Sequence, residues 1–473
     1  MASNLPGYVA SAQPNPTTNR VPWFASTAQT YAGIMLWFVF WQKVPAAGDT
    51  PGGTLAAGLG VAFGALVVAA LLAHFLYYLV PGLLGMKTGL PLYIVGTSTY
   101  GVQGGFFMPG FLMGLLQFGW LGVNACFSAA FLVLPFYADK DLLGVISTPP
   151  HIAVAILWAA LAAFMGLKGI HYVAKVASFL PLIPLVILIV LFVSTVGGVG
   201  SFDVQQSIDA TGSNVMPLSR EAIFGLMLTY VLGFFATAGA AGCDFGMNNR
   251  HLKDVQLGGL AGIAGATIFA GGLALLIVAG AHGAGKSGDL AQMNPTELMG
   301  GVLGAKVGAT FMYLLAIAAF PPACFSAFIA ANSFKTTLPK VNPFITVGIG
   351  TVASIVLAVT GWAAKVEFVF GIIGASFGPV CGAMFADYML AGRKWAGPRA
   401  GFNLAGWISW VAGFCVGAFN GLIGIAAPNS PFVGLVPVPP LSAFVVGFLL
   451  YFILAKIGLQ SRVLPMPQRI DGE

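Results

Sequence analysis

Long apolar runs separated by short polar connections repeat along the whole chain. Residues 55–80, 172–199 and 257–281 each reach or exceed the roughly 20 apolar residues that cross a bilayer as an α-helix. The alternation of apolar and polar positions over about 10 residues that is typical of a membrane β-barrel is absent. The pattern predicts twelve transmembrane helices, at 24–45, 55–80, 105–134, 150–167, 172–199, 222–242, 257–281, 306–331, 344–362, 367–391, 404–424 and 436–457.

Composition excludes a water-soluble fold. Of the 473 residues, 58% are hydrophobic and only 7% are charged, against about 25% charged in an average soluble domain. So few charges cannot cover the surface of a protein of this size, so lipid must take the place of water around it. We therefore expect an all-α integral membrane protein whose surroundings are the lipid bilayer.

The distribution of Lys and Arg predicts the orientation of the helices. With both termini in the cytoplasm, 14 of the 20 basic residues fall on the inner side, as the positive-inside rule requires. The net charge of +6 then follows from membrane topology and implies no nucleic-acid partner. We expect a multi-pass protein of the cell's inner (plasma) membrane.

Residues that would indicate enzymatic or metal chemistry do not cluster. The five cysteines lie in apolar segments without a CxxC pair, so we expect buried free thiols and no disulfide. The five histidines have no metal-ligand spacing. No nucleophile–base pair and no phosphate loop appears, so neither an enzyme nor an organic cofactor or metal is expected.

Two predicted helices are interrupted, and they are five spans apart. Residues 233–242 of the sixth span contain several small residues that weaken a helix, and the first span contains Gln42-Lys43-Val44-Pro45. Broken helices at such positions are typical of inverted five-helix repeats, although glycines that serve only close packing give the same pattern. The resulting division is a tail at 1–22, repeats at 23–200 and 201–400, two further helices at 401–458, and a tail at 459–473.

One face of the third predicted span carries polar and aromatic side chains. Gln117, Trp120 and Asn124 recur at i, i+3 and i+7, so they share one face of a helix. Two amides and a flat indole suit a planar heteroaromatic ligand. A polar contact between helices, glued by amide hydrogen bonds, is the alternative.

The weakened part of the sixth span offers a second candidate surface. Phe235 and Thr237 lie there, where unwound backbone groups would be free to bind a ligand at mid-membrane depth. An aromatic ring at this position could stack on the other face of a ring held by Trp120. A phenylalanine in an apolar span is, however, more often a core or lipid-facing residue.

Several motifs, in order, carry a resemblance to a known family. They are residues 89–105, ending Tyr100-Gly101-Val102-Gln103-Gly104-Gly105; Gly119-Trp120-Leu121-Gly122; Cys243-Asp244-Phe245 with Arg250; and Gly378-Pro379 with Ala386-Asp387-Tyr388-Met389-Leu390, then residues 403–410. Together they resemble the nucleobase–cation symport family (cytosine, purine, uracil, thiamine and allantoin permeases), nearest its cytosine-permease branch. The likeness runs from about Val21 to Leu450.

The resemblance implies a fold and a set of site residues. The fold is of the leucine-transporter type, with two inverted five-helix repeats plus two C-terminal helices and a site between helices 1, 3, 6 and 8. In that family the tryptophan of the Gly-Trp core stacks on the base. The substrate-binding residues implied here are Trp120, Gln117, Asn124, Phe235, Thr237, Gln42 and Ser326.

We expect the coupling ion to be sodium or a proton. Phe320 and Pro321 stand where the resemblance leads us to expect sodium-binding hydroxyls, and a hard cation needs several oxygen ligands. Lys175, two turns beyond Lys168, could lie inside the bundle and titrate during transport, or extend to the interface. We therefore expect a secondary permease for a nucleobase or similar small planar heteroaromatic. The alternatives are another solute class, such as a vitamin precursor or a hydantoin, and a non-transporting membrane subunit.

Overall fold

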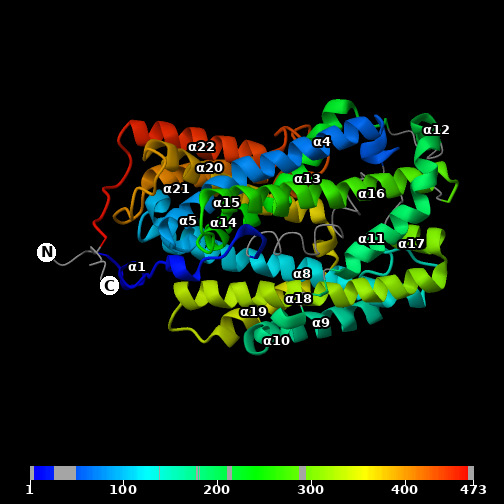
Figure 1. Ribbon diagram of the computed structural model, residues 1–473, viewed down its shortest axis with the longest axis horizontal. Coiled ribbons are helices and arrows are strands. Elements are labelled where there is room, and N and C mark those ends of the chain that lie inside the picture. The colour runs from blue at the N-terminus through cyan, green and yellow to red at the C-terminus, as the bar shows by residue number, and fades with distance from the viewer. Residues whose placement is uncertain are drawn as a thin grey trace.

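The computed structural model describes residues 5–25, 50–137, 139–176, 179–180, 182–209, 216–286 and 295–466. Within these ranges every regular element is a helix, as expected where backbone groups in lipid must be satisfied within the segment. The helices form one elongated bundle, and α1 (Gly7–Ala10) and the C-terminal end of α22 (Pro439–Lys456) lie at the same end of it (Figure 1). We call this the termini end; short helices α12 (Val204–Asp209) and α17 (Pro295–Leu303) lie at the opposite end.

Ten helices of the described chain are long and apolar enough to cross a membrane. An eleventh, α19 (Pro343–Val359), is apolar but shorter, and most of the expected first span at 24–45, including Gln42, lies outside the described residues. The ten are Leu59–Thr88 (α4, η3, α5), Phe106–Phe136 (η4, α8, η5), Pro149–Lys168 (α9), Leu182–Ser201 (α11, η6), Arg220–Ala240 (α13), Leu252–Gly283 (α15, η7, α16), Ala305–Lys335 (within α18, Ala305–Thr337), Val366–Leu390 (α20), Leu404–Ala426 (α21) and Pro439–Lys456 (α22).

The fifth predicted span begins later than expected. The sequence pattern placed it at 172–199, but residues 170–176 form a separate short helix, α10 (Ile170–Val176), and the spanning helix begins at Leu182. Pro184 lies in the first turn of α11 (Leu182–Thr195), where a residue without an N–H is tolerated. An unbroken apolar run therefore contains a helix boundary that hydropathy alone does not reveal.

The sixth span is interrupted near the end of the expected stretch 233–242, and most of that stretch is regular helix. Helix α13 runs through residues 233–240, the break falls at Ala241, and the short helix α14 (Gly242–Gly246) follows. Close packing explains the glycines: a Cβ atom on Gly233 would lie 2.8 Å from the Phe370 carbonyl oxygen, and one on Gly239 would lie 2.6 Å from the Tyr77 Cβ. At these positions the glycines serve helix–helix contact.

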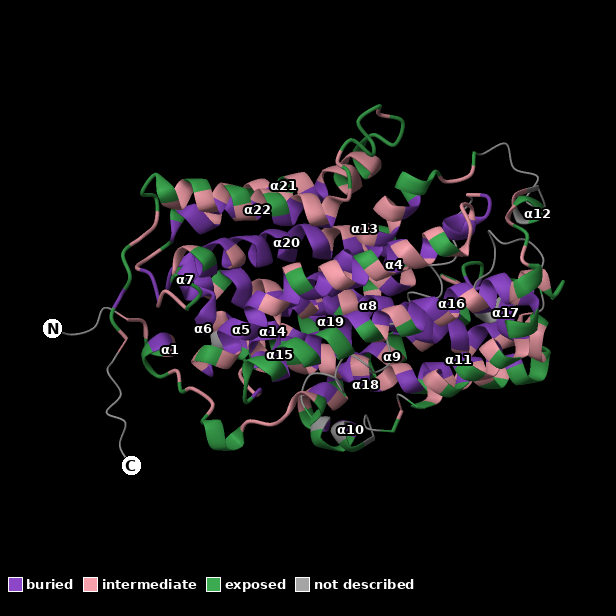
Figure 2. Ribbon diagram, turned by 45° about the horizontal axis from the view of Figure 1, so that its top comes forward, coloured by how far each residue is buried: buried purple, intermediate pink, exposed green. Residues whose placement is uncertain are grey.

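Two helices occupy the middle of the bundle. Helix α8 (Leu112–Val133) packs against α9, α18 and α19, and α20 packs against α13, α21 and α22. Both are largely buried, while the exposed positions gather on the outer helices (Figure 2). Residues on α8 and α20 are therefore candidates for an internal site.

All five cysteines are free thiols, as expected. Four of them are buried, but Cys415 of α21 is exposed, so the expected burial is wrong at that position. Helix α21 lies on the outside of the bundle, where an apolar side chain can face lipid as readily as the core (Figure 2).

Candidate functional site

Helix α8 positions the polar face that the sequence predicted. Its buried residues include Gln117 and Asn124, which are 8% and 3% exposed, and Trp120 packs against the core from the same side. Met113 precedes Gln117 by one turn, so the four side chains form one stripe along the helix. We call Met113, Gln117, Trp120 and Asn124 the α8 stripe.

Trp120 stands against an aromatic wall built by two other helices. Its ring centroid is 5.1 Å from that of Phe234 on α13, edge to face, and 5.7 Å from that of Phe370 on α20. Its indole Nε1–H donates a hydrogen bond of 3.4 Å to the hydroxyl of Thr237. Trp120 and Thr237 are therefore brought together, as the sequence predicted.

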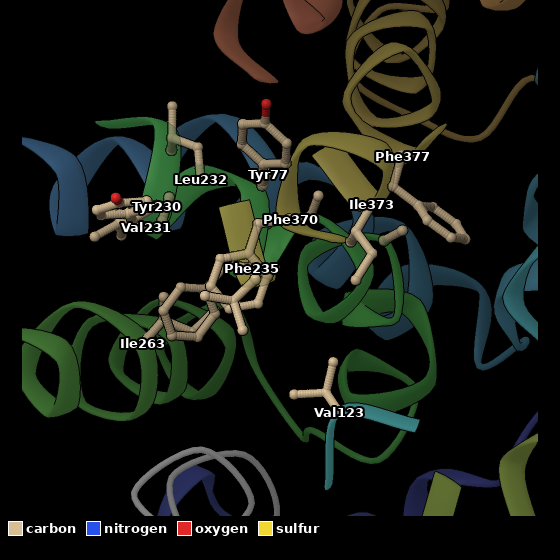
Figure 3. Close-up of a cluster of buried hydrophobic side chains, with 14 of the residues drawn as sticks. Tyr77, Val123, Tyr230, Val231, Leu232, Phe235, Ile263, Phe370, Ile373 and Phe377 are labelled. Atoms are coloured by element: carbon tan, nitrogen blue, oxygen red, sulfur yellow. The ribbon is translucent and has the colours of Figure 1, made fainter. Parts of the chain in front are cut away.

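The aromatic side chain of α13 that contacts Trp120 edge to face is Phe234, and its neighbour Phe235 packs in the apolar core. The side chain of Phe235 is 0% exposed and lies among apolar residues such as Ile263 and Phe370 (Figure 3). Successive residues of a helix point about 100° apart, so Phe234, three positions before Thr237, shares the Thr237 face and Phe235 does not. The ring of α13 that lies against Trp120 in this structure is therefore that of Phe234.

The side chain of Asn124 makes hydrogen bonds that connect helices. Its Nδ2 donates to the Ala319 carbonyl of α18 at 2.9 Å, and its Oδ1 accepts from Trp158 Nε1 of α9 at 3.0 Å. Ser128 Oγ donates to the same Oδ1 at 3.3 Å. Pro321 and Pro322 follow Ala319 inside α18, so Asn124 ties α8 to the part of α18 next to these prolines.

Gln117 has a different environment on the same stripe. Its only recorded hydrogen bond within the described ranges is a 3.7 Å contact from Nε2 to the thioether sulfur of Met113. Sulfur is a weak acceptor, so this amide keeps most of its donor and acceptor capacity. A buried amide with capacity to spare suits recognition of a polar ligand edge.

Ser326 lies on the face of α18 that meets the α8 stripe. Ala319 and Ser333, seven residues before and after it, both contact α8: Ala319 through Asn124, and Ser333 where a Cβ on Gly114 would lie 3.0 Å away. Residues seven apart on a helix share a face. The antiparallel register therefore places Ser326 level with Gln117 and Trp120, and it is partly buried there.

The neighbourhood of Phe320 is apolar. Its ring meets Trp158 edge to face at 5.1 Å, beside a small cluster that contains Leu121 and Ala323. Pro321 follows inside α18. Neither side chain supplies the oxygen ligand that a sodium ion requires.

Lys175 lies outside the bundle, so of its two possible positions the structure shows the one at the interface. The side chain is exposed on α10, and its Nζ lies 5.9 Å from the ring centroid of Tyr172, itself exposed. Because the spanning helix begins only at Leu182, Lys175 belongs to a connecting segment. Its position is that of an interfacial lysine.

A small cavity continues the α8 stripe toward the termini end. It holds about 40 Å³, enough for ordered water. Met113, the residue that contacts Gln117, forms part of its wall. The lining residues are Leu92 and Tyr93 of α6 (Leu92–Val95), Pro109 and Gly110 of η4 (Phe106–Phe111), Met113 of α8, Asp244 of α14, and Ser333 and Thr337 of α18.

Sequence reasoning missed three residues of this region. Phe234 could have been found from its i, i+3 relation to Thr237. Phe370 and Asp244 come from other segments, and no local pattern links them to Trp120 or Met113. Only the packing of α13, α20 and α14 around α8 brings them together.

This arrangement is a polytopic bundle of apolar helices, and solved structures of the leucine-transporter type share its fold. The solved structure of Mhp1 in its inward-facing conformation matches 98% of this chain and 97% of its own, with a TM-score of 0.67 and 16% identity. Mhp1 in a closed conformation with bromovinylhydantoin bound, a nucleobase-cation-symport-1 family transporter, matches with a TM-score of 0.59 and 15% identity over 96% and 97% of the two chains.

Sequence comparison adds a relative. The cytosine permease of Escherichia coli strain K12 is 27% identical over 418 residues, which cover 86% of each chain. No family model matches the chain. The relative and the solved structures together confirm the resemblance to the nucleobase–cation symport family.

Proposed function

We propose that this protein carries a nucleobase, or a closely similar planar heteroaromatic, across the membrane by alternating access. The observation that supports this most is the pairing of Trp120 with Gln117 on α8: a flat aromatic surface lies one turn from an amide with spare hydrogen-bonding capacity. The named substrate of the cytosine permease and the hydantoin bound to Mhp1 are both small, planar, polar rings.

The chemistry of a base matches these residues. Its face can stack on Trp120 within the wall formed with Phe234 and Phe370, and such stacking contributes about 1–3 kcal/mol per base. Its edge carries donors and acceptors in the ring plane, which an amide such as Gln117 can meet with both of its groups. Thr237 and Ser326 supply further hydroxyls at this level.

Transport of the base together with a small cation fits this proposal, because the gradient of the cation can drive uptake of the base against the gradient of the base itself. The apolar surroundings of Phe320 favour a proton over sodium. With Lys175 exposed, its ammonium has no part in the coupling we propose. The location we propose is the inner membrane, with the termini end in the cytoplasm.

Counterflow in proteoliposomes tests the substrate. Vesicles that contain the purified protein are loaded with unlabelled cytosine, and entry of labelled cytosine is followed without an ion gradient. We expect saturable entry that other nucleobases inhibit. Saturable entry of a hydantoin without any entry of bases would reassign the solute class, and the absence of entry for every planar ring would favour the non-transporting subunit.

A further inference from the structure

The cavity at the termini end contains a carboxyl group to which the predicted substrate site assigns no role. Asp244 is the only acidic residue in its wall, and Ser333, Thr337 and Tyr93 are the other polar residues there. Met113 lines this cavity and also contacts Gln117, so Asp244 and the α8 stripe lie on either side of the same methionine.

The bonding of Asp244 is incomplete. Its Oδ1 accepts one hydrogen bond, from the Leu92 N–H at 3.1 Å. No lysine, arginine or histidine lies within salt-bridge distance of it in the described part of the chain. Asp387, at the same end of the bundle, provides the contrast: it pairs with Arg399 at 3.0 Å and accepts from Ser98 and Tyr451.

The basic groups of the neighbouring elements are engaged elsewhere. Lys87 of α5 (Leu79–Thr88) donates to the Arg393 carbonyl and the Tyr388 hydroxyl. Arg20 donates to the backbone carbonyls of Asn15 and Met86. These contacts leave both cations away from Asp244.

The remaining charged and titratable groups around the cavity do not neutralise the carboxylate of Asp244 either. Lys335 of α18 is exposed, and Arg250 pairs with Asp254. Helix α8 and η4 contribute no charged side chain. The other titratable neighbours are Cys243 of α14, which is buried, and Tyr93 of α6.

We propose that Asp244 binds the coupling proton and releases it to water in this cavity, which rests on the transport function proposed above. In the step at the termini end, the carboxyl O–H bond breaks, the proton passes to a water molecule, and the carboxylate keeps the Leu92 N–H as its donor. The proton returns when the carboxylate is next exposed to the acidic side. One proton is thereby carried for each cycle in which a base crosses.

The acid strength of Asp244 suits that role. Burial raises the pKa of its carboxyl to about 6, while the hydrogen bond from Leu92 acts in the opposite direction. At pH 5 the carboxyl is therefore mostly protonated, and at pH 7.5 it is mostly ionised. An aspartate with its ordinary pKa would be ionised on both sides of the membrane and would carry no proton.

The substitution Asp244→Asn tests the proposal, because the asparagine Oδ1 still accepts from Leu92 while the titration is removed. We expect the variant to lose the accumulation of labelled cytosine driven by an acidic exterior, by at least about tenfold, while counterflow remains detectable. Asp254→Asn, which removes an ion-paired acid that the cavity does not contain, is expected to keep the response. Accumulation by Asp244→Asn that follows the pH gradient as in the wild type would overturn the proposal.

A stability measurement reports the titration independently of transport. A carboxyl whose pKa is raised by folding contributes stability that is fully present below its unfolded pKa, near 4, and that is lost as pH rises through its folded pKa of about 6. The Tm of the wild type should therefore fall relative to that of Asp244→Asn between pH 4 and pH 7. A constant difference in Tm would contradict the titration.

Two outcomes separate this proposal from the proposed function. No counterflow of any base by the wild type would refute the nucleobase assignment, and with it the coupling scheme that rests on that assignment. Counterflow by the wild type without any pH-driven accumulation would refute the role of Asp244 alone. Should Asp244→Asn fail to fold, the wild type must still show a carboxyl that titrates near pH 6 by infrared difference spectroscopy, and its absence would refute that role.

Discussion

The polar groups near the two ends of the α8 stripe differ in how many hydrogen bonds they make. At one end Asn124 is saturated: it donates to the Ala319 carbonyl and accepts from both Trp158 and Ser128. Toward the termini end, Gln117 reaches only a thioether sulfur, and Asp244 accepts a single backbone hydrogen bond beside a cavity. The two amides lie two turns apart on one face of the same helix.

This difference separates two roles for polar residues inside a membrane. A saturated side chain ties helices together, because its donors and acceptors have nowhere else to go in lipid. A buried polar side chain with unmade hydrogen bonds raises the free energy of the folded protein. A ligand, water or proton that bonds to it lowers that free energy. By this criterion Asn124 holds α8, α9 and α18 in register, and Gln117 is the amide available to a substrate.

The largest expected effect concerns the two neighbouring phenylalanines of α13. Phe235→Ala should lower the free energy of unfolding by about 3–5 kcal/mol, because it empties a fully buried position. Phe234→Ala should cost less stability and should instead weaken base binding, by about 1 kcal/mol for the lost edge-to-face contact with Trp120. Thermal unfolding and equilibrium binding of the two variants check the assignment; a reversal of the two effects would restore Phe235 as the ligand contact.

Trp120→Ala should remove most of the affinity for the base. Loss of stacking corresponds to about 1–3 kcal/mol, a rise in Kd of roughly 5- to 150-fold. Equilibrium binding of labelled cytosine measures it, with Trp362→Ala as the control because Trp362 is an exposed tryptophan whose ring contacts Lys365 and Phe368. Equal affinity in wild type and Trp120→Ala would place the ligand elsewhere.

Asn124→Ala should act on stability rather than on recognition. It removes three hydrogen bonds, each worth about 0.6 kcal/mol in a membrane protein, so the loss is roughly 2 kcal/mol. Unfolding in detergent, followed with and without saturating base, separates the two roles. A variant of wild-type stability that no longer binds the base would reverse our interpretation of Asn124.

Gln117→Ala is expected to have the smallest structural effect. Only the contact to Met113 is lost, so the Tm should change little, while base affinity should fall by about 1 kcal/mol, roughly fivefold. Gln117→Glu sharpens the test, because it preserves size and exchanges the donor for an acceptor. A large drop in Tm for Gln117→Ala would show that this amide is structural, as Asn124 is.

Hydropathy and helix periodicity predict much of this architecture and little of its detail. The expected spans at 105–134 and 222–242 agree closely with Phe106–Phe136 and Arg220–Ala240, because lipid imposes a minimum apolar length. The position of Lys175 stayed open at the level of sequence because the apolar run 172–199 contains parts of two helices. Side chains one position apart, such as Phe234 and Phe235, are equally apolar in sequence and are distinguished only by packing.

The shared face of Gln117, Trp120 and Asn124 could be predicted because helical periodicity is local. Which of the amides is saturated could not, since the partners Ala319 and Trp158 come from other helices. The cavity beside Asp244 has the same limitation: its walls come from five segments of the chain. Long-range packing, rather than any motif, distinguishes a structural amide from one that is free to bind.

A structure of the protein with bound cytosine tests the central claim most directly. Our account predicts a base ring stacked on Trp120, with its polar edge hydrogen-bonded to the Gln117 amide, while Asn124 keeps its bonds to Ala319 and Trp158. A base bound away from Trp120, or one held by an Asn124 side chain released from α9 and α18, would contradict it.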